Sequence, residues 1–218
     1  MTMFFPIYLN LTGKRVVVIG GGEVAERKVA ALSDTGAEIT VVSPALTLQL
    51  LSLANSNAIR WQNRSYVRGD CAGATLVFSA TDDPETSRAV WEEATTARIL
   101  VNTADQPTLC DFIMPAVVRR GDLAVAISTG GASPALAATL REKLSEELGP
   151  EYEELLEILS QARPEIRRRF HDEVDRKALH YRILESNVID LLKREDREGA
   201  ERVLREIIGD FTCQEKIR

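Results

Sequence analysis

The stretch that decides the fold is residues 14–29, KRVVVIGGGEVAERKV. A run of β-branched residues leads into three consecutive glycines, and a charged segment with helical spacing follows. Glycine is unfavourable inside a strand or a helix because it loses the most backbone freedom on ordering. The three glycines therefore indicate a junction between a strand and a helix, at which the backbone must stay free of side chains.

Residues 20–25, GGGEVA, match the pattern G-x-G-x-x-A in that strand-to-helix context. In this pattern Gly20 allows the tight turn, Gly22 lets a pyrophosphate approach the backbone, and Ala25 permits close packing of the helix on the strand. The N–H groups at the start of the helix then bind the phosphates. The pattern predicts a dinucleotide site; a tight turn without a ligand is the alternative.

Strands and helices alternate over the first half of the chain. The runs RVVVIG and EITVVS are rich in β-branched residues and show no amphipathic alternation, as in parallel strands that helices cover on both faces. Further strands are expected at residues 58–62, 74–81 and 98–104, and helices at 23–35, 45–56 and 85–97. This order predicts an α/β fold with a doubly wound parallel sheet, a dinucleotide-binding Rossmann domain over residues 1–111, and it leaves the choice between NAD and NADP open.

The pattern changes after residue 111. Two apolar runs flank RRGD within residues 112–129, which predicts a β-hairpin, and SPALAATLREKLSEEL predicts a helix capped by Ser133. Because exposed sheet edges pair with other chains, we expect a dimerisation segment over residues 112–148 and a homodimer with residues 112–129 at its interface. Residues 149–218 are charged and helix-forming, with apolar spacing, and predict a helical domain.

Composition narrows the class of protein. The chain has 218 residues, a formal charge of −6 and a pI near 5.2, which argues against a surface dedicated to nucleic acid. Cys71, Cys110 and Cys213 are widely spaced and form no CxxC motif, so neither a disulfide framework nor a thiolate metal site is indicated. No apolar run approaches the length of a membrane span. We expect a soluble cytoplasmic protein with no membrane partner.

Polar residues follow three of the predicted strands, at the edge where open α/β sheets bind ligands. Ser43 stands where an acid would bind the ribose of NAD, and it could bind a ribose hydroxyl or start the next helix. Thr81 and Asp82 could approach the nicotinamide side of the cofactor, whereas the neighbouring Asp83 is interpreted as a helix cap. The remaining two such residues are Asn102 and Asp105.

Asp105 is the candidate general base. An ionised carboxylate beside a nicotinamide could accept a proton while a hydride leaves. The alternative is an Asx turn that leads into Gln106 and Pro107.

Later stretches give weaker signals. Ser128, Thr129 and Gly130 form a loop before a helix, which is either an anion site or an ordinary capped helix start. His171 and His180 are interpreted as surface or packing residues, and no metal site is predicted. The basic cluster RPEIRRRF, residues 163–170, is either a solvated helix face or a site that attracts a polyanion.

Four stretches together resemble one known family. FPIYLNLTGKRVVVIGGGEVAERKVAAL, SATDDPETSR, VNTADQPTLCDFIMPA and AISTGGASPALAATLREKL are similar, in this order, to the precorrin-2 dehydrogenase module of siroheme biosynthesis. The resemblance covers residues 5–148 best, and it weakens from about residue 187. The chain resembles the free-standing form of this module, which has no methyltransferase domain.

The resemblance implies a function and a set of site residues. It implies NAD-dependent oxidation of precorrin-2 to sirohydrochlorin, and in some members insertion of ferrous iron to give siroheme. The aspartate of the family's VNxxD stretch, which is implicated in that chemistry, corresponds to Asp105, whereas Thr103 and Ala104 replace the bulkier aliphatic residues that are usual there. The residues implied to line the cofactor are Gly22, Glu23, Val24, Ser43 and Pro44.

The substrate of that family carries several carboxylates, so it needs cations around its cleft. Arg119, Arg120 and Arg141 follow the predicted sheet and are the candidates. Two other classes of protein remain as alternatives: a regulatory protein that senses NAD, and an NAD-binding scaffold without dehydrogenase activity. A regulatory protein would need a basic recognition helix. A scaffold without activity would be favoured if Asp105 were lost, but Asp105 is present.

Overall fold

The computed structural model describes residues 4–211, so Cys213 and the ends of the predicted first and last domains lie outside it. The chain forms two compact units that divide between Met114 and Pro115. The division into three domains stays a prediction. In the part of the chain that the structure describes, no helix is long and apolar enough to span a membrane.

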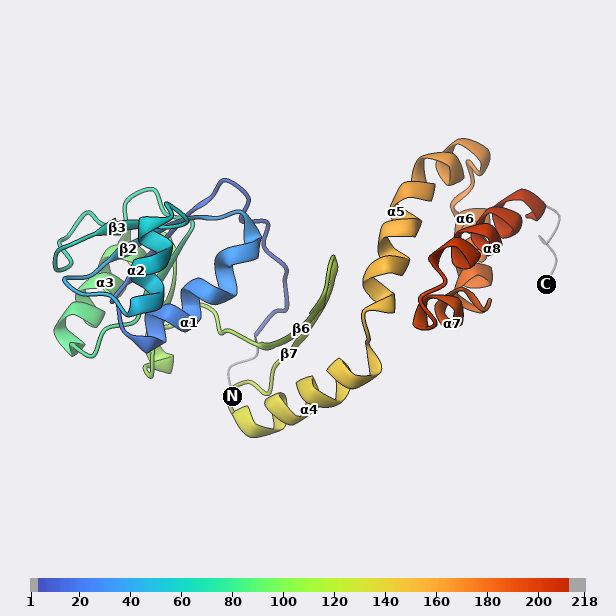
Figure 1. Cartoon of the computed structure of the whole chain (residues 1–218). Helices are drawn as coiled ribbons and strands as arrows, with labels where there is room; N and C mark the ends of the chain where they lie inside the picture. The colour runs from blue at the N-terminus through green and yellow to red at the C-terminus, as the bar shows by residue number, and fades with distance from the viewer. Residues whose placement is uncertain (1–3, 212–218) are drawn as a thin grey trace. The chain divides into compact units, whose positions relative to one another are not determined.

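The first unit is built on a five-stranded parallel sheet in the order β3-β2-β1-β4-β5 (Figure 1). This is the Rossmann order, in which the chain reverses direction across the sheet between β1 and β4. The predicted doubly wound sheet is therefore confirmed. Its strands are β1 (Arg15–Ile19), β2 (Glu38–Val42), β3 (Arg60–Gln62), β4 (Leu76–Ser79) and β5 (Leu100–Thr103).

Helices cover both faces of this sheet, which explains why its central strands do not alternate between apolar and polar residues. On one face α1 (Glu23–Leu32) and α2 (Leu48–Asn55) pack on Val16 and Val18 of β1. On the other face α3 (Pro84–Thr96) packs on Val17 and Val77. Successive residues of β1 thus point to opposite faces of the sheet, and both faces are buried from solvent.

The second unit begins with the predicted hairpin. β6 (Ala116–Arg120) and β7 (Leu123–Ile127) pair antiparallel, and α4 (Pro134–Glu147) contacts β6 (Figure 1). Gly121 in the turn has φ +53°, a left-handed conformation that favours glycine. A Cβ at Gly121 would lie 2.7 Å from Cγ of Glu153, so a side chain there would also displace the side chain of Glu153.

Four helices complete this unit: α5 (Glu151–Arg169), α6 (Glu173–Leu184), α7 (Val188–Lys193) and α8 (Arg197–Asp210). Their core contains a T-shaped pair of rings, Phe170 and Phe211, with centroids 5.3 Å apart. The apolar spacing of the last helical region includes both Ile183 and Leu184, but the structure separates them: Ile183 is buried, whereas Leu184 is 48% exposed.

A buried carboxylate makes the stability of the first unit depend on pH. Asp70 is 7% exposed; both its oxygens accept hydrogen bonds from the guanidinium of Arg64, at 2.8 and 2.6 Å, and one also accepts from Val67 N at 2.9 Å. The hydrogen bond from Arg64 lowers the pKa of Asp70. A carboxylate with a lowered pKa stabilises the fold above its unfolded pKa, and this stabilisation disappears as the pH falls through the folded pKa.

Asp70→Asn is therefore expected to reduce the free energy of unfolding at pH 7 by about 1–2 kcal/mol, a value kept low because Arg64 is partly exposed and solvent screens the pair. Thermal denaturation between about pH 2 and 7 measures the effect, and the variant should show a flatter loss of Tm in acid. The exposed Asp34→Asn is the control. An unchanged acid limb in Asp70→Asn would contradict this account.

Candidate dinucleotide and substrate site

The first two glycines of the motif are required by contacts within the protein. Gly20 has φ +116°, and a Cβ there would lie 2.1 Å from the carbonyl oxygen of Ala80, after β4. A Cβ at Gly21 would lie 2.0 Å from the carbonyl oxygen of Ala45 and 2.7 Å from Oγ of Ser43, after β2. The turn therefore packs against the loops at the carboxyl ends of both neighbouring strands.

The third glycine faces open space. A Cβ at Gly22 would meet no protein atom within 4 Å, and Gly22 is the N-cap of α1 with no side-chain hydrogen bond to the helix. Bare backbone at an uncapped helix N-terminus fits a pyrophosphate, which accepts hydrogen bonds from the N–H groups and is favoured by the helix dipole. The predicted difference between Gly20, for the turn, and Gly22, for the ligand, agrees with this geometry.

Ser43 lies at the end of β2, is buried, and its Oγ donates to the carbonyl oxygen of Ala45 at 2.7 Å. It does not start the next helix, because Thr47 is the N-cap of α2 and accepts from Leu50 N at 3.3 Å. That alternative is wrong, and contact of Ser43 or of the exposed Pro44 with a ribose stays a prediction.

The loop after β4 starts α3. Asp83 is the N-cap: its carboxylate accepts hydrogen bonds from the N–H groups of Glu85 and Thr86, at 3.1 and 3.2 Å, and from Oγ1 of Thr86. These hydrogen bonds lower the pKa of Asp83, and the bond from the Thr86 hydroxyl has the largest effect. The interpretation of Asp83 as a cap is confirmed. Oγ1 of Thr81 accepts from Asp83 N at 3.3 Å, while Asp82 is exposed at the same edge.

The loop after β5 is fixed by Asn102 and Cys110. Nδ2 of the buried Asn102 donates to the carbonyl oxygen of Phe112 at 2.9 Å. Sγ of Cys110 accepts from Thr103 N at 3.2 Å and lies 3.2 Å from the oxygen of the same residue. Burial raises the pKa of the Cys110 thiol, so the sulfur keeps its proton at neutral pH. Asn102 thus uses its amide nitrogen to position the loop that carries Asp105.

Asp105 itself is held in an unusual backbone conformation. It has φ +57°, in the left-handed region that few residues other than glycine, asparagine and aspartate adopt. The side chain is exposed, and no hydrogen bond to it is found within residues 4–211, so the Asx turn considered as an alternative is not formed. The loop therefore presents a carboxylate whose oxygens are available to a ligand.

A pocket of about 470 Å³ opens beside Asp105. Val24 from the first turn of α1 lines it together with Asn102 and the loop after β5. The pocket thus connects the predicted phosphate-binding helix with the predicted base. Its lining also includes Arg27 and Lys28, two cations from the next turn of α1.

Lys28 is the cation of the pocket lining that interacts electrostatically with Asp105. Its pKa is lowered, chiefly because burial disfavours the charged amine, whereas Coulombic interactions with Cys110 and, less strongly, with Asp105 oppose that shift. Nζ lies 5.6 Å from the centroid of the Phe78 ring, a cation–π contact. The ammonium therefore lies between an aromatic ring and the pocket that holds Asp105.

The predicted substrate residues belong to the second unit. The Ser128 hydroxyl accepts from Gly130 N at 3.1 Å, and Oγ1 of Thr129 accepts from Ser133 N at 3.1 Å. Ser133 caps α4, as the ordinary interpretation of this loop expected. The loop is thus held by its own side chains, and a ligand on it stays a prediction.

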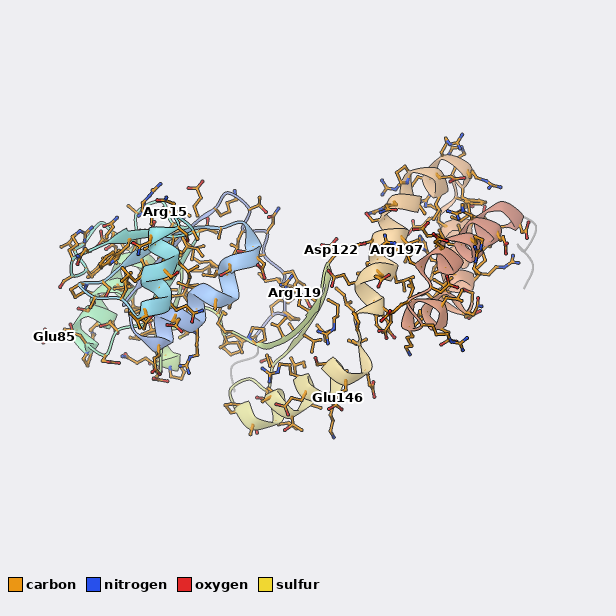
Figure 2. All side chains as sticks on the ribbon, viewed as in Figure 1. Arg15, Glu85, Arg119, Asp122, Glu146 and Arg197 are labelled. Atoms are coloured by element: carbon orange, nitrogen blue, oxygen red, sulfur yellow. The ribbon has the colours of Figure 1, made fainter. Side chains whose placement is uncertain are left out.

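The three arginine candidates differ in their contacts. Arg120 donates to the carbonyl oxygen and to Oγ of Ser145, at 2.8 and 2.9 Å, and so ties β6 to α4. Arg141 forms an exposed ion pair with Glu142 at 3.4 Å. Arg119 is exposed on β6 (Figure 2). Arg120 thus has a structural contact, while Arg119 and Arg141 are accessible from solvent.

Sequence reasoning missed Gly21, Arg27, Lys28 and Cys110. A signal for the two cations was present, because residues three and four apart share a helix face, and Arg27 and Lys28 follow Val24 at this spacing. Gly21 gave no signal, since only the fold brings Ala45 against it. No group of three or more metal-ligating side chains is found between residues 4 and 211.

A glycine turn joining β1 to α1, with an open helix N-terminus at the reversal point of a parallel sheet, defines a Rossmann-type dinucleotide-binding protein. The chain belongs to the putative NAD(P)-binding family, whose model matches half of it. Three family models match it in succession: putative NAD(P)-binding (residues 7–116), sirohaem biosynthesis protein central (120–147) and sirohaem synthase dimerisation region (151–208). The last extends beyond residue 187, where the resemblance in sequence weakened.

Individual relatives agree with the models. The siroheme synthases of Nitrosococcus oceani and Thioalkalivibrio sulfidiphilus are 37% and 39% identical to this chain over 90% and 92% of its length. The chain spans less than half of these relatives, 43% and 42%. A solved structure, SirC, a precorrin-2 dehydrogenase, matches 93% of this chain and all of its own with a TM-score of 0.73 and 25% identity.

Proposed function

We propose that this protein oxidises precorrin-2 to sirohydrochlorin with NAD⁺ as the hydride acceptor, in the biosynthesis of siroheme. The observation that carries the proposal is the pocket in which Asp105, with a carboxylate available to a ligand, lies next to the open N-terminus of α1. Family membership and the likeness to a precorrin-2 dehydrogenase support the choice of substrate.

The residues of the pocket have different roles in the proposed dehydrogenation. NAD⁺, when bound, supplies a hydride acceptor. The N–H groups of α1 behind Gly22 hold its pyrophosphate, and Val24 forms the wall between this helix and the pocket. The carboxylate of Asp105 takes up the proton that leaves the neighbouring position of the substrate. Lys28 and Arg27 offer positive charge to substrate carboxylates.

Preference for NAD⁺ over NADP⁺ is part of the proposal. No acid follows β2 to bind the ribose hydroxyls, and Ser43 and the exposed Pro44 occupy this position. The choice of NAD⁺ rests on the family resemblance and needs a direct comparison of the two cofactors.

An anaerobic assay tests the function. The protein is mixed with precorrin-2 and either NAD⁺ or NADP⁺, and the tetrapyrrole and reduced nicotinamide spectra are followed together. Formation of sirohydrochlorin with one reduced nicotinamide per turnover is expected, faster with NAD⁺. A protein that binds the cofactor but leaves precorrin-2 unchanged would favour the scaffold or sensor alternative. Adding ferrous iron after oxidation tests iron insertion in the same vessel.

We also propose that the protein is a homodimer in the cytoplasm. Val117 on β6 and Leu136 and Leu140 on α4 are 40%, 51% and 38% exposed, which leaves apolar surface on the hairpin and its helix. A family model named for dimerisation matches the helices that follow. Sedimentation at micromolar concentration is expected to give twice the mass of the chain, and Leu136→Glu with Leu140→Glu should shift it toward the monomer. A monomer in the unaltered protein would contradict the proposal.

A further inference from the structure

A second cavity, of about 460 Å³, lies between α5 and α6 in the second unit. Its lining is mainly basic, and the proposed oxidation does not use it. One carboxylate, that of Glu173, belongs to the lining. The basic side chains around it are Arg163, Arg167, Arg176, Lys177 and His180.

The spacing of these residues brings their charges to one place. Arg163 and Arg167 are four apart on α5, and Arg176 and His180 are four apart on α6, so each pair shares a helix face. Both faces line the same cavity. Part of the solvent-exposed basic cluster seen in the sequence therefore lines one side of a hollow whose other side is also basic.

In the part of the chain that the structure describes, the basic side chains of the cavity lack ion-pair partners, and Glu173 is the one carboxylate among the lining residues. Within residues 4–211, none of the five basic side chains forms an ion pair with a carboxylate. In the same unit Arg197, labelled in Figure 2, is paired with both Glu157 and Glu201, at 2.9 and 3.4 Å. Like charges held close together repel one another, and a multivalent anion in the cavity would relieve that repulsion.

One of the guanidinium groups is already oriented. NH1 of Arg176 donates to the carbonyl oxygens of Phe170 and His171, at 2.9 and 2.7 Å, at the end of α5. These bonds fix the side chain before a ligand arrives, so binding costs less side-chain entropy. The other N–H groups of a guanidinium remain suited to bidentate contact with a carboxylate.

The cavity also has an apolar part. Ile166 is buried at its base, while Tyr181 and Leu184 are 56% and 48% exposed. Nζ of Lys177 lies 5.9 Å from the centroid of the Tyr181 ring. Exposed apolar side chains between cations suit a ligand with an apolar or aromatic body, on which a ring can stack.

We propose that this cavity is a second binding site, for a flat apolar molecule that carries several carboxylates. The observation behind it is the juxtaposition of five unpaired basic side chains with the exposed faces of Tyr181 and Leu184. The natural ligand would be a tetrapyrrole acid, and this identification rests on the proposed function. The site would hold substrate or product on side chains of the second unit, none of which belongs to the residues proposed to carry out the oxidation.

Isothermal titration of the full chain with benzenehexacarboxylate, in low salt and without cofactor, tests the proposal. We expect one binding event that the triple variant Arg163→Gln, Arg167→Gln, Lys177→Gln weakens at least tenfold. The matched control variant removes three positive charges outside the cavity: Lys193→Gln on α7, Arg194→Gln at the end of α7 and Arg202→Gln on α8. It should bind benzenehexacarboxylate within twofold of the unaltered protein. Lys28→Gln should also leave this affinity unchanged. Arg167→Gln alone is used if the triple variant does not fold.

Equal losses in both triple variants would overturn the proposal, since net charge alone would then explain binding. Unchanged affinity in the cavity variant would overturn it as well. Pyrophosphate is the second probe: if it binds in the cavity as tightly as benzenehexacarboxylate, the apolar part of the claim is wrong. Because none of these titrations involves turnover, they can succeed when precorrin-2 oxidation fails, and the reverse also holds.

Discussion

Asp105→Asn is expected to lower kcat for precorrin-2 oxidation by about 10²- to 10⁴-fold, the range typical of a removed general base. Asparagine keeps the size of the side chain and tolerates the left-handed conformation that Asp105 adopts at φ +57°. It loses only the negative charge that accepts the proton. The affinity for NAD⁺ should stay within about twofold, because the N-terminus of α1 is unaltered. Stopped-flow absorbance with saturating substrate measures the chemical step.

A second variant separates charge from backbone geometry. Asp105→Gly also fits a positive φ, and it should be as inactive as Asp105→Asn if the carboxylate is what matters. Asp105→Ala is avoided, since alanine would add backbone strain to the loss of charge. If Asp105→Asn turned over within threefold of the unaltered enzyme, Asp105 would not be the base.

The second large effect concerns two adjacent glycines: substitution of Gly21 should destabilise the fold, whereas substitution of Gly22 should weaken cofactor binding. Gly21→Ala places a Cβ 2.0 Å from the carbonyl oxygen of Ala45, so the backbone of the turn must move. A loss of about 3 kcal/mol in the free energy of unfolding is expected, together with loss of cofactor binding. Gly22→Ala meets no protein atom within 4 Å and has a backbone conformation open to alanine, with φ −85°. Its stability should change by no more than about 1 kcal/mol.

The cofactor distinguishes the two variants. Gly22→Ala should fold normally but raise the Kd for NAD⁺ at least tenfold, because the new methyl group occupies the space in which the pyrophosphate approaches the backbone. Urea denaturation and titration with NAD⁺ measure the two quantities on the same samples. Normal NAD⁺ affinity in Gly22→Ala would show that the pyrophosphate lies elsewhere.

The sequence predicts the first unit well because local and global signals agree there. The glycine turn, the apolar strands and the cap at Asp83 each follow from a few neighbouring residues. The hairpin around Gly121 is predicted for the same reason. Asp105 also stands out locally, since it follows a strand whose carboxyl end faces the crevice.

What escaped prediction depends on contacts between distant segments. Gly21 matters because Ala45 lies against it, and Lys28 matters because α1 brings it near a loop about 77 residues further along the chain. Leu184 fits an inward-facing pattern, yet α6 leaves it at the edge of the basic cavity. Periodicity identifies one face of a helix, but it does not decide which part of that face another helix covers.

The left-handed backbone at Asp105 limits which residues evolution can place there. A glutamate would offer the same carboxylate chemistry on a longer stem, but it fits a positive φ poorly, so the nearest chemical substitute is penalised by the main chain. A member of the family that has lost the oxidation while keeping this loop should therefore carry asparagine or glycine at this position. The identity of this one residue would then distinguish working enzymes from relatives that only bind the cofactor.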